Sequence, residues 1–383
     1  MDVDACPGLL RAFARLEDPR MDRTKRHELS DILTIAICAV ICGADGWVQV
    51  AHFGECKEKW FRTFLDLPNG IPSHDTFGRV FARLDPVAFE RCFLEWVAQM
   101  AHASQGRLVA IDGKTIRRSL DAANGQAAIH MVSAWCQANH MVLGQVATDA
   151  KSNEITAIPA LLKLLDIEGA VVSIDAAGCQ KKIAAQIVDQ GGDYLLQLKA
   201  NQTALHADAV ELFDHCLRDD CLGIAYTTAE TVNGGHGRIE RRRLWATSEI
   251  GWCAERKKWK KLKSLIRVEA QRTVDGETSC ETRYFISSRP ADDPEKLLEH
   301  VRGHWGVENG LHWCLDISFA DDQRRIRKGH GAENFARLSR IALNLLKAQR
   351  SHKVGIKTKR LCCGWNHDYL LRVLTQQDYG IKI

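Results

Sequence analysis

In the first hundred residues, apolar side chains recur with the spacing of amphipathic helices. Two such stretches run from Leu29 to Cys42 and from Val87 to Met100, and their period predicts helices. Between them a proline is followed by Ser73 and Asp75, either of which can cap a short helix. We therefore predict an all-helical N-terminal domain over residues 1–100. Such a domain fits a DNA-binding helix-turn-helix or a packing and dimerisation unit, and the pattern does not separate the two.

After residue 106 the helical period gives way to short apolar runs, which are typical of buried strands. We predict strands over residues 107–111, 129–136, 141–148, 170–174 and 194–198, and helices over residues 154–165 and 180–190. The resulting order is β-β-β-α-β-α-β. This alternation predicts an α/β fold, with parallel strands in one sheet and helices on its faces.

Residues 201–289 have a different pattern, and we predict that they form a β-rich insertion. β-branched and aromatic residues fill two stretches, which are interrupted by Gly234-Gly235 and by Asp275-Gly276. Turn residues in these positions indicate hairpins. After Pro294 the chain returns to a helical pattern. We therefore assign residues 101–200 and 290–350 to the α/β core and residues 351–383 to a C-terminal tail.

Two aspartates, Asp112 and Asp175, each follow one of the predicted buried strands. In open α/β sheets, ligands gather at the carboxyl ends of the strands. Two carboxylates on neighbouring strands would repel each other, and a bound divalent cation relieves that repulsion. Hard oxygen ligands suit Mg²⁺ or Mn²⁺. The alternative is that the two aspartates are unrelated and only cap turns, as Asp112-Gly113 would.

A third carboxylate, Glu308, falls on the apolar stripe of a predicted helix. The stripe consists of Val301, Trp305, Glu308, His312 and Leu315. A carboxylate that faces a core is costly unless it is paired or bound to a metal. Three glycines, at positions 303, 306 and 310, surround it, and each costs about 1 kcal/mol relative to alanine in a helix. We expect either a close backbone approach or a local break in the helix near Glu308.

Two alternatives for Glu308 are open at this point. It can be a buried structural residue paired with Arg302 or with a neighbouring histidine. It can also share a zinc ion with His304 and His312, since the three lie on one helical face. The His-Glu-x-x-His signature of zinc proteases is absent, which disfavours zinc.

Composition and charge add little to this picture. The net charge is +4, and basic residues gather in several clusters that can either neutralise phosphates or form a solvated surface. No apolar run is long enough to span a bilayer, and the apolar stretch near residue 35 lacks the flanks of a signal peptide. We expect a cytoplasmic protein.

Five ordered motifs stand out in the sequence. They are Ile111-Asp-Gly-Lys-Thr-Ile-Arg-Arg118, Lys151-Ser-Asn-Glu-Ile155, Ile174-Asp-Ala-Ala-Gly-Cys-Gln180, Leu198-Lys-Ala-Asn-Gln202 and His304-Trp-Gly-Val-Glu-Asn309 with Leu311-His-Trp313. Together they resemble the motifs of the ISAs-type insertion-sequence transposases, a family that includes the H-repeat-associated proteins. The resemblance extends from about Leu16 to Gln349.

The resemblance implies a ribonuclease H-like catalytic core with an Asp-Asp-Glu triad. Asp112, Asp175 and Glu308 match the catalytic, metal-binding positions of the family. The β-rich stretch matches an insertion between the second aspartate and the glutamate, and the helical region matches the associated domain. The implied cofactor is a pair of Mg²⁺ or Mn²⁺ ions, roughly 4 Å apart. The ions would activate water, and later a 3′-hydroxyl, for DNA phosphoryl transfer.

The implied partner is double-stranded DNA, which comprises the element ends and the target. The protein is expected to bind this DNA as a homodimer, and no membrane is expected as a partner. The resemblance also implies that the protein is bacterial and associated with the nucleoid when it is bound to DNA. The residues expected to contact DNA are Lys114, Lys199, Arg302, Asn309, Arg324 and Arg325. The chain departs from related transposases that carry Tyr, Arg and Lys around the glutamate, because Val301, His304 and Leu315 occupy those positions. The phosphate contacts of those residues do not transfer, and a hairpin intermediate is not implied.

Three other functions compete with transposition. The chain can be an immobile H-repeat-associated relative that binds DNA without moving it. It can be a ribonuclease H-like nuclease that cuts DNA without joining it. A transcription regulator is the third, although a regulator would not need a glutamate in a glycine-flanked helix.

Overall fold

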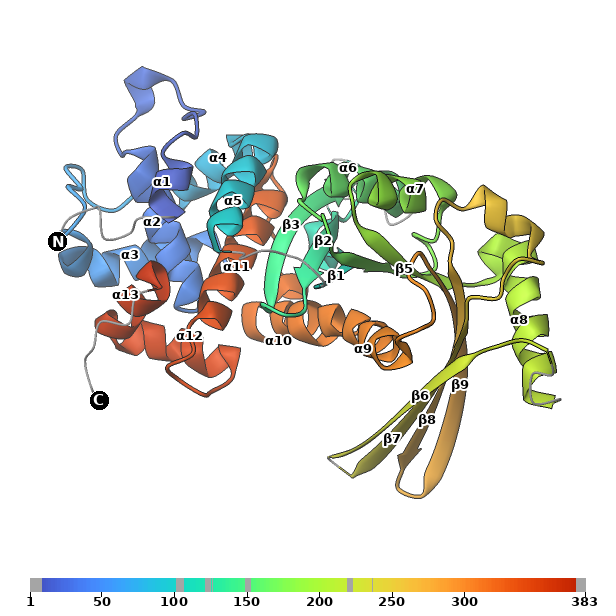
Figure 1. Cartoon of the computed structure of the whole chain (residues 1–383). Coiled ribbons are helices and arrows are strands. Elements are labelled where there is room, and N and C mark those ends of the chain that lie inside the picture. Colours follow the sequence, from blue (N-terminus) through green and yellow to red (C-terminus); the bar gives the residue numbers. More distant parts are fainter. Residues whose placement is uncertain are drawn as a thin grey trace.

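The computed structural model describes residues 9–100, 107–120, 125, 127–148, 153–218, 223–235 and 237–376. Helices from both ends of the chain lie together at one end of the molecule, and one large sheet forms the rest (Figure 1). Short 3₁₀ helices occur at Asp22–Thr24, Arg117–Ser119, Ala200–Gln202, Ala254–Lys258 and Asp321–Gln323. None of the described helices is both long and apolar enough to cross a membrane.

The N-terminal region is helical, as predicted. Its helices are α1 (Leu9–Phe13), α2 (Leu29–Ile41), α3 (Trp47–Phe61), α4 (His74–Arg83) and α5 (Pro86–Met100). The predicted cap of the short helix is confirmed, because the side chain of Ser73 accepts a hydrogen bond from the Thr76 amide at the start of α4. Helix α2 is apolar on nearly every side and is buried along almost its whole length.

The described strands form one sheet of nine, in the order β3-β2-β1-β4-β5-β9-β8-β7-β6. Strand β1 pairs in parallel with β4, and β4 with β5, whereas the other neighbours are antiparallel. The strands are β1 (Leu108–Thr115), β2 (His130–Cys136), β3 (Met141–Thr148), β4 (Val171–Ile174), β5 (Asp193–Leu198), β6 (Thr227–Gly235), β7 (Arg238–Thr247), β8 (Ser264–Val274) and β9 (Glu277–Ser287). The predicted order of strands and helices in the first half of this sheet is confirmed.

Helices cover both faces of the sheet (Figure 1). Apolar residues of α6 (Glu154–Leu164), α7 (Lys181–Asp189) and α8 (Thr203–Arg218) form one buried cluster with one side of the strands. Residues of α9 (Pro294–His304) form another cluster on the opposite side. Because strand residues alternate between the two faces, β1 contributes Ile111 to the first cluster and Leu108 to the second.

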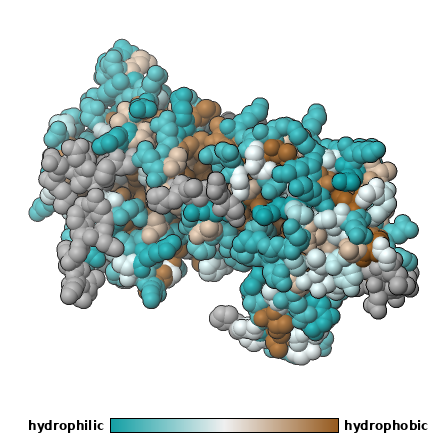
Figure 2. All heavy atoms as spheres, in the orientation of Figure 1, coloured by the Kyte–Doolittle hydropathy of each residue, from teal (hydrophilic) through white to brown (hydrophobic). Residues whose placement is uncertain are grey.

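Strands β6 to β9 extend past the body of the molecule as a long, twisted ribbon (Figure 1). The predicted turn at Asp275-Gly276 is confirmed, and both residues have positive φ, as a two-residue hairpin turn requires. The other predicted turn is displaced, since Gly234 and Gly235 still belong to β6. Figure 2 shows hydrophilic residues over most of this side of the molecule, with an apolar patch near the ribbon's free end, where Val232 and Ile239 are exposed.

The C-terminal residues pack against the N-terminal helices. They form α10 (Trp313–Phe319), α11 (Gly331–Ala348), α12 (Ile356–Trp365) and α13 (His367–Thr375). The segment assigned to a tail from residue 351 therefore contains two helices, and their buried residues join one core with α2, α4, α5 and α11. Arg360 on α12 donates to the carbonyl oxygen of Val40 at 2.8 Å, which ties the two ends of the chain together.

A buried ion pair joins the helical part to the edge of the sheet. Glu90 on α5 accepts a hydrogen bond from Arg337 on α11 at 2.7 Å and another from the Gln145 amide on β3 at 2.8 Å. Arg337 also donates to Glu333 at 2.7 Å. Glu90 is only 4% exposed and Arg337 only 2%, so the charge of Glu90 depends on Arg337 for compensation, and the charge of Arg337 depends on the two glutamates.

We predict that Glu90→Ala lowers the free energy of unfolding by about 3 kcal/mol, because it removes one of the two carboxylate partners of buried Arg337 and leaves the Gln145 amide without its acceptor. The matched control is Glu58→Ala, which breaks the partly exposed pair with Arg62 and should cost less than about 1 kcal/mol. Urea unfolding followed by circular dichroism measures both. Equal, small losses for the two variants would show that the buried pair does not hold the parts together.

Candidate active site

Asp112 and Asp175 lie next to each other on the neighbouring parallel strands β1 and β4. The pairing runs to Ile111 opposite Ile174, and each aspartate is the following residue. This pairing confirms the prediction that the two strands are adjacent. Neighbouring strands of a sheet are about 4.8 Å apart. One detail differs, because β1 does not end at Asp112 but continues to Thr115 alongside β2.

Alternation along each strand sets the direction of the two carboxylates. Ile111 and Ile174 belong to the core under α6 and α7, whereas Leu108 and Val171 pack with α9. The aspartates follow the isoleucines and therefore face the side of the sheet that α9 covers. The strand pattern thus brings both carboxylates to the segment that contains Glu308.

Backbone amides hold one oxygen of each aspartate. Asp112 Oδ1 accepts from the Gly113 amide at 2.9 Å, and Asp175 Oδ1 accepts from the Ala177 and Gly178 amides at 3.0 and 3.2 Å. The turn-capping role considered for these residues is therefore present. It does not account for the burial of Asp112, whose side chain is 23% exposed.

The charges around Asp112 are mostly negative. Burial, together with the carboxylates of Asp175, Glu154 and Glu308, raises the pKa of Asp112 to about 7, although the Gly113 amide opposes the rise. In the described parts of the chain, no lysine or arginine forms an ion pair with Asp112, Asp175 or Glu308. The site thus carries negative charge that the protein itself leaves uncompensated.

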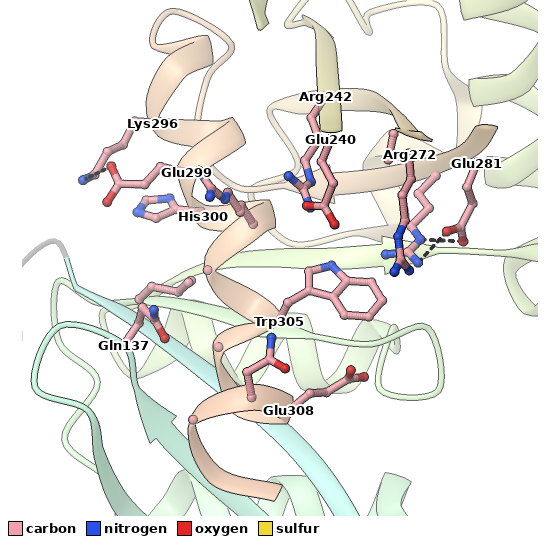
Figure 3. Close-up of a pocket in the computed structure, with 18 of the residues that line it drawn as sticks. Gln137, Glu240, Arg242, Arg272, Glu281, Lys296, Glu299, His300, Trp305 and Glu308 are labelled. Carbon is pink, nitrogen blue, oxygen red and sulfur yellow. Dashed lines mark hydrogen bonds and ion pairs between the residues drawn. The ribbon is translucent and has the colours of Figure 1, made fainter. Parts of the chain in front are cut away.

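Glu308 begins a π-helical turn, Glu308–His312, inserted between α9 and α10. Its side chain is exposed and lines a groove with Trp305 and Asn309 (Figure 3). The prediction that Glu308 faces the core is therefore wrong. The extra residue of a π turn shifts the helical phase, so a stripe counted at a constant period does not continue through it. The expected local break in the helix is confirmed.

The three glycines form the face of this helix that touches the sheet. A Cβ on Gly303 would collide with Leu108, and one on Gly306 would collide with Gln137. A Cβ on Gly310 would lie 2.7 Å from Trp135 Cζ2. The expected close backbone approach is confirmed, and it turns the opposite face, with Trp305 and Glu308, toward the groove.

Two histidines that were weighed as zinc ligands have other partners. His304 Nδ1 is 2.9 Å from Ser173 Oγ, and His312 Nδ1 is 3.5 Å from Asp112 Oδ2. Burial lowers the pKa of His304 to about 4 and that of His312 to about 3, so both imidazoles are neutral at pH 7. The π turn separates them from a common face with Glu308.

The sequence did not indicate that a histidine and a glutamate pair next to Gly113, the residue after Asp112. His130 Nε2 lies 2.6 Å from Glu154 Oε1, and His130 Nδ1 lies 2.8 Å from Thr115 Oγ1. A side chain on Gly113 would collide with His130 and Glu154, so the glycine of the first motif keeps room for this pair. Glu154, in the second motif, was the only available signal.

The oxygens of Asp112, Asp175 and Glu308 are the hard ligands that Mg²⁺ and Mn²⁺ prefer, and their uncompensated charge fits a cation. The three carboxylates do not converge on one point. No three histidine, cysteine, aspartate or glutamate side chains of the described ranges are close enough to form a metal-binding group. The aspartates fit two ligands of such an ion, and Glu308 lies at the edge of the groove beside them.

Two residues expected to contact DNA are buried in ion pairs. Lys114 is 8% exposed and lies 2.7 Å from Asp316 and 3.1 Å from Asp322. Arg324 is 7% exposed and lies 2.9 Å from Asp321. This burial disfavours a direct phosphate contact for either residue, and we leave both out of the interface proposed below.

The other four expected DNA contacts are exposed: Lys199, Arg302, Asn309 and Arg325. Lys199 directly follows β5, the parallel neighbour of β4, and so lies at the same edge of the sheet as Asp175. Arg302 donates to Asn233 on β6 at 3.0 Å, and both Arg302 and Asn309 line the groove.

The groove runs between the ribbon and α9 and has a volume of about 1420 Å³. Figure 3 shows Arg242 and Arg272 on the ribbon facing it, with Trp305 and Glu308 on the helix side. Eight arginines and lysines line it, against four glutamates. A groove with this excess of cations, open to solvent beside the carboxylates, suits a polyanion.

We predict that Gly310→Ala lowers the melting temperature, because the new methyl group meets the rigid ring of Trp135. Alanine would otherwise stabilise a helix by about 1 kcal/mol, so the sign of the change tests the contact. The control is Gly251→Ala, where nothing lies within 4 Å of the added methyl group. Thermal unfolding by calorimetry measures both. An increase for Gly310→Ala would contradict the tight packing of this helix.

Comparisons with known proteins identify the family of this chain. The family described as "Transposase DDE domain" matches residues 103–345, and the family described as "DDE_Tnp_1-associated" matches residues 10–97. Among solved structures, the chain resembles the piggyBac transposase synaptic complex with hairpin DNA at a TM-score of 0.43 and 9% identity. That alignment covers 98% of this chain and 78% of the other, and a likeness so distant supports no inference.

Two curated relatives match almost the whole chain. "Putative transposase YncI" of Escherichia coli O157:H7 is 42% identical over 96% of this chain and 94% of its own length. "H repeat-associated putative transposase YhhI" of Escherichia coli (strain K12) is 38% identical over 96% of this chain and 97% of its own length. The chain belongs to the DDE transposase family.

Proposed function

We propose that this chain is a metal-dependent transposase that cleaves DNA at the ends of an insertion sequence and joins those ends to a target. The observation that carries the proposal is the register of β1 and β4. It places Asp112 beside Asp175. Glu308 lines the groove, and no lysine or arginine of the described segments is paired with any of the three carboxylates. The sheet and its flanking helices would then be a ribonuclease H-like core.

In this proposal Asp112, Asp175 and Glu308 hold divalent metal ions. The ions would supply Lewis-acid stabilisation of the charge that develops on the reacting phosphate and would lower the pKa of a bound water. The rest of the work falls to the chain. The Gly113, Ala177 and Gly178 amides fix one oxygen of each aspartate, which limits the reorganisation needed at the site.

DNA would enter along the groove between the ribbon and α9. Arg302 and Asn309 are exposed there, one turn on either side of the Trp305 position. Lys199 and Arg325 are exposed cations that do not line the groove, and they would extend the contact to flanking phosphates. Such contacts position the strand, and positioning contributes most of the rate in phosphoryl transfer. Assembly as a homodimer on paired ends completes the proposal.

We predict that Glu308→Gln lowers end cleavage on the order of a thousandfold, since loss of a metal ligand removes several kcal/mol of transition-state stabilisation. Binding of the DNA should be unchanged or slightly tighter. The substrate is labelled duplex carrying the inverted repeat that flanks the coding sequence, with Mg²⁺ or Mn²⁺. The matched control is Glu299→Gln, which removes another exposed carboxylate from the same groove and should leave cleavage intact.

The same assay separates the competing functions. Wild type that nicks the ends and joins them to a second duplex supports the transposase. Wild type that cuts without joining supports a ribonuclease H-like nuclease. Wild type that binds the ends and does neither, with both metals tested, supports the immobile H-repeat-associated relative.

We also predict that Mn²⁺ raises the melting temperature of the wild type by a few degrees, because a ligand that binds only the folded state stabilises it. Asp112→Asn and Asp175→Asn should each abolish the rise. Asp189→Asn, which alters an exposed aspartate of α7, should keep it. Calorimetry with and without EDTA measures the melting temperature of each variant and does not require an assay of enzymatic activity. A rise that persists in both site variants would place the metal elsewhere.

A further inference from the structure

The two faces of the ribbon are chemically similar but have different neighbours. Near the base of the ribbon, Leu244 and Ala246 of β7 pack in the same cluster as α9. By alternation, Arg242, Glu240 and Arg238 continue on that inner face along β7. All three line the groove. Residues at odd positions of β7, such as Arg241 and Arg243, lie on the outer face.

Three arginines of the inner face are already partnered by glutamates of the same face. Arg242 lies 2.6 Å from Glu240, and Arg238 lies 3.5 Å from the same carboxylate. On β9, Arg283 makes two hydrogen bonds of 2.7 Å to Glu281. Figure 3 shows Glu240 beside Arg242 and Glu281 opposite Arg272, all at the groove. Each glutamate thus occupies guanidinium donors that could bind a phosphate, namely Nη2 of Arg242 and both Nε and Nη2 of Arg283.

These pairs are well formed although they are partly open to water. Glu240 is 20% exposed and Arg242 is 22% exposed. Burial opposes ionisation of Glu240, but the guanidinium groups of Arg242 and Arg238 outweigh it, and the pKa of Glu240 is lowered. A phosphate that binds Nη2 of Arg242 therefore competes with the ionised carboxylate of Glu240.

We propose that the inner face of the ribbon is the surface that follows the DNA backbone, and that Glu240 and Glu281 are its built-in counter-ions, which DNA phosphates displace on binding. This inference rests on the proposed function. In the absence of DNA, the three paired arginines of the inner face would then be neutralised by Glu240 and Glu281. Weak, non-specific anions do not break the pairs, whereas a duplex that presents several phosphates in register does.

The outer face supplies a matched control. There Glu230 lies 2.7 Å from Arg241 and 2.6 Å from Arg243. As on the inner face, one glutamate neutralises two arginines of the same hairpin. The Glu230 cluster lies on the outer face of the sheet, whereas the Glu240 cluster lies on the inner face. Glu240→Gln and Glu230→Gln therefore change the net charge equally and differ in whether the freed arginines face the groove.

The test is fluorescence anisotropy of a labelled 40-base-pair duplex with the full chain in EDTA, titrated at several salt concentrations. Glu240→Gln should tighten binding about threefold to fivefold, the range set by release of a partly exposed ion pair. Its plot of log affinity against log salt should steepen by about one. Glu230→Gln should change affinity by less than about 1.5-fold on the same scale. In the Arg242→Gln background, Glu240→Gln should tighten binding less than it does in the wild type, because only Arg238 is then released from Glu240.

Two results would overturn the inference. One is equal tightening by Glu240→Gln and Glu230→Gln, which would mean that net charge alone matters. The other is unchanged or weaker binding by Glu240→Gln while its melting temperature matches that of the wild type. A wild type that binds no duplex would instead contradict the proposed function, so the two failures are distinguishable.

Discussion

The parallel pairing of β1 with β4 is the constraint on which the candidate site depends. It brings Asp112 beside Asp175 although the two are far apart in sequence, and burial makes their repulsion costly, as the raised pKa of Asp112 shows. The sheet tolerates this cost because its apolar residues are buried on both faces. The strain of two close carboxylates is thus supported by the hydrophobic burial of the strands that carry them.

Glu308 comes close enough to influence the charge of Asp112 by a different physical route. Its helix has three glycines where it meets the sheet, so its backbone approaches Leu108, Gln137 and Trp135 too closely for any side chain. The π turn then adds a residue and turns Glu308 outward. A helix held by its backbone on one side presents its long side chains on the other. The glycines therefore position the carboxylate without touching it.

Most strands and helices could be predicted from the sequence because apolar period and turn residues are local signals. The aspartates at Asp112 and Asp175 were found for the same reason, since each directly follows an apolar run. The π turn could not be predicted, because a constant helical period was assumed through Glu308. The ion pairs of Lys114 with Asp316 and Asp322 join residues about two hundred positions apart, and no local pattern reports such a pairing. For the same reason, a basic cluster in the sequence does not show that Arg324 is buried and its neighbour Arg325 exposed.

The site and the groove beside it handle charge in opposite ways. In the groove, the guanidinium groups of Arg242 and Arg283 have carboxylate partners within hydrogen-bond distance. Among the carboxylates of the site, no described lysine or arginine offers the same compensation. A fold that pairs charges so readily along the ribbon has the means to do so at Asp112 as well, yet it places the neutral imidazole of His312 there. The missing positive charge is consistent with a cation supplied from solution, whereas the paired arginines are suited to a polyanion strong enough to exchange for their glutamates. This difference in pairing separates the part of the groove that would position DNA from the part that would act on it.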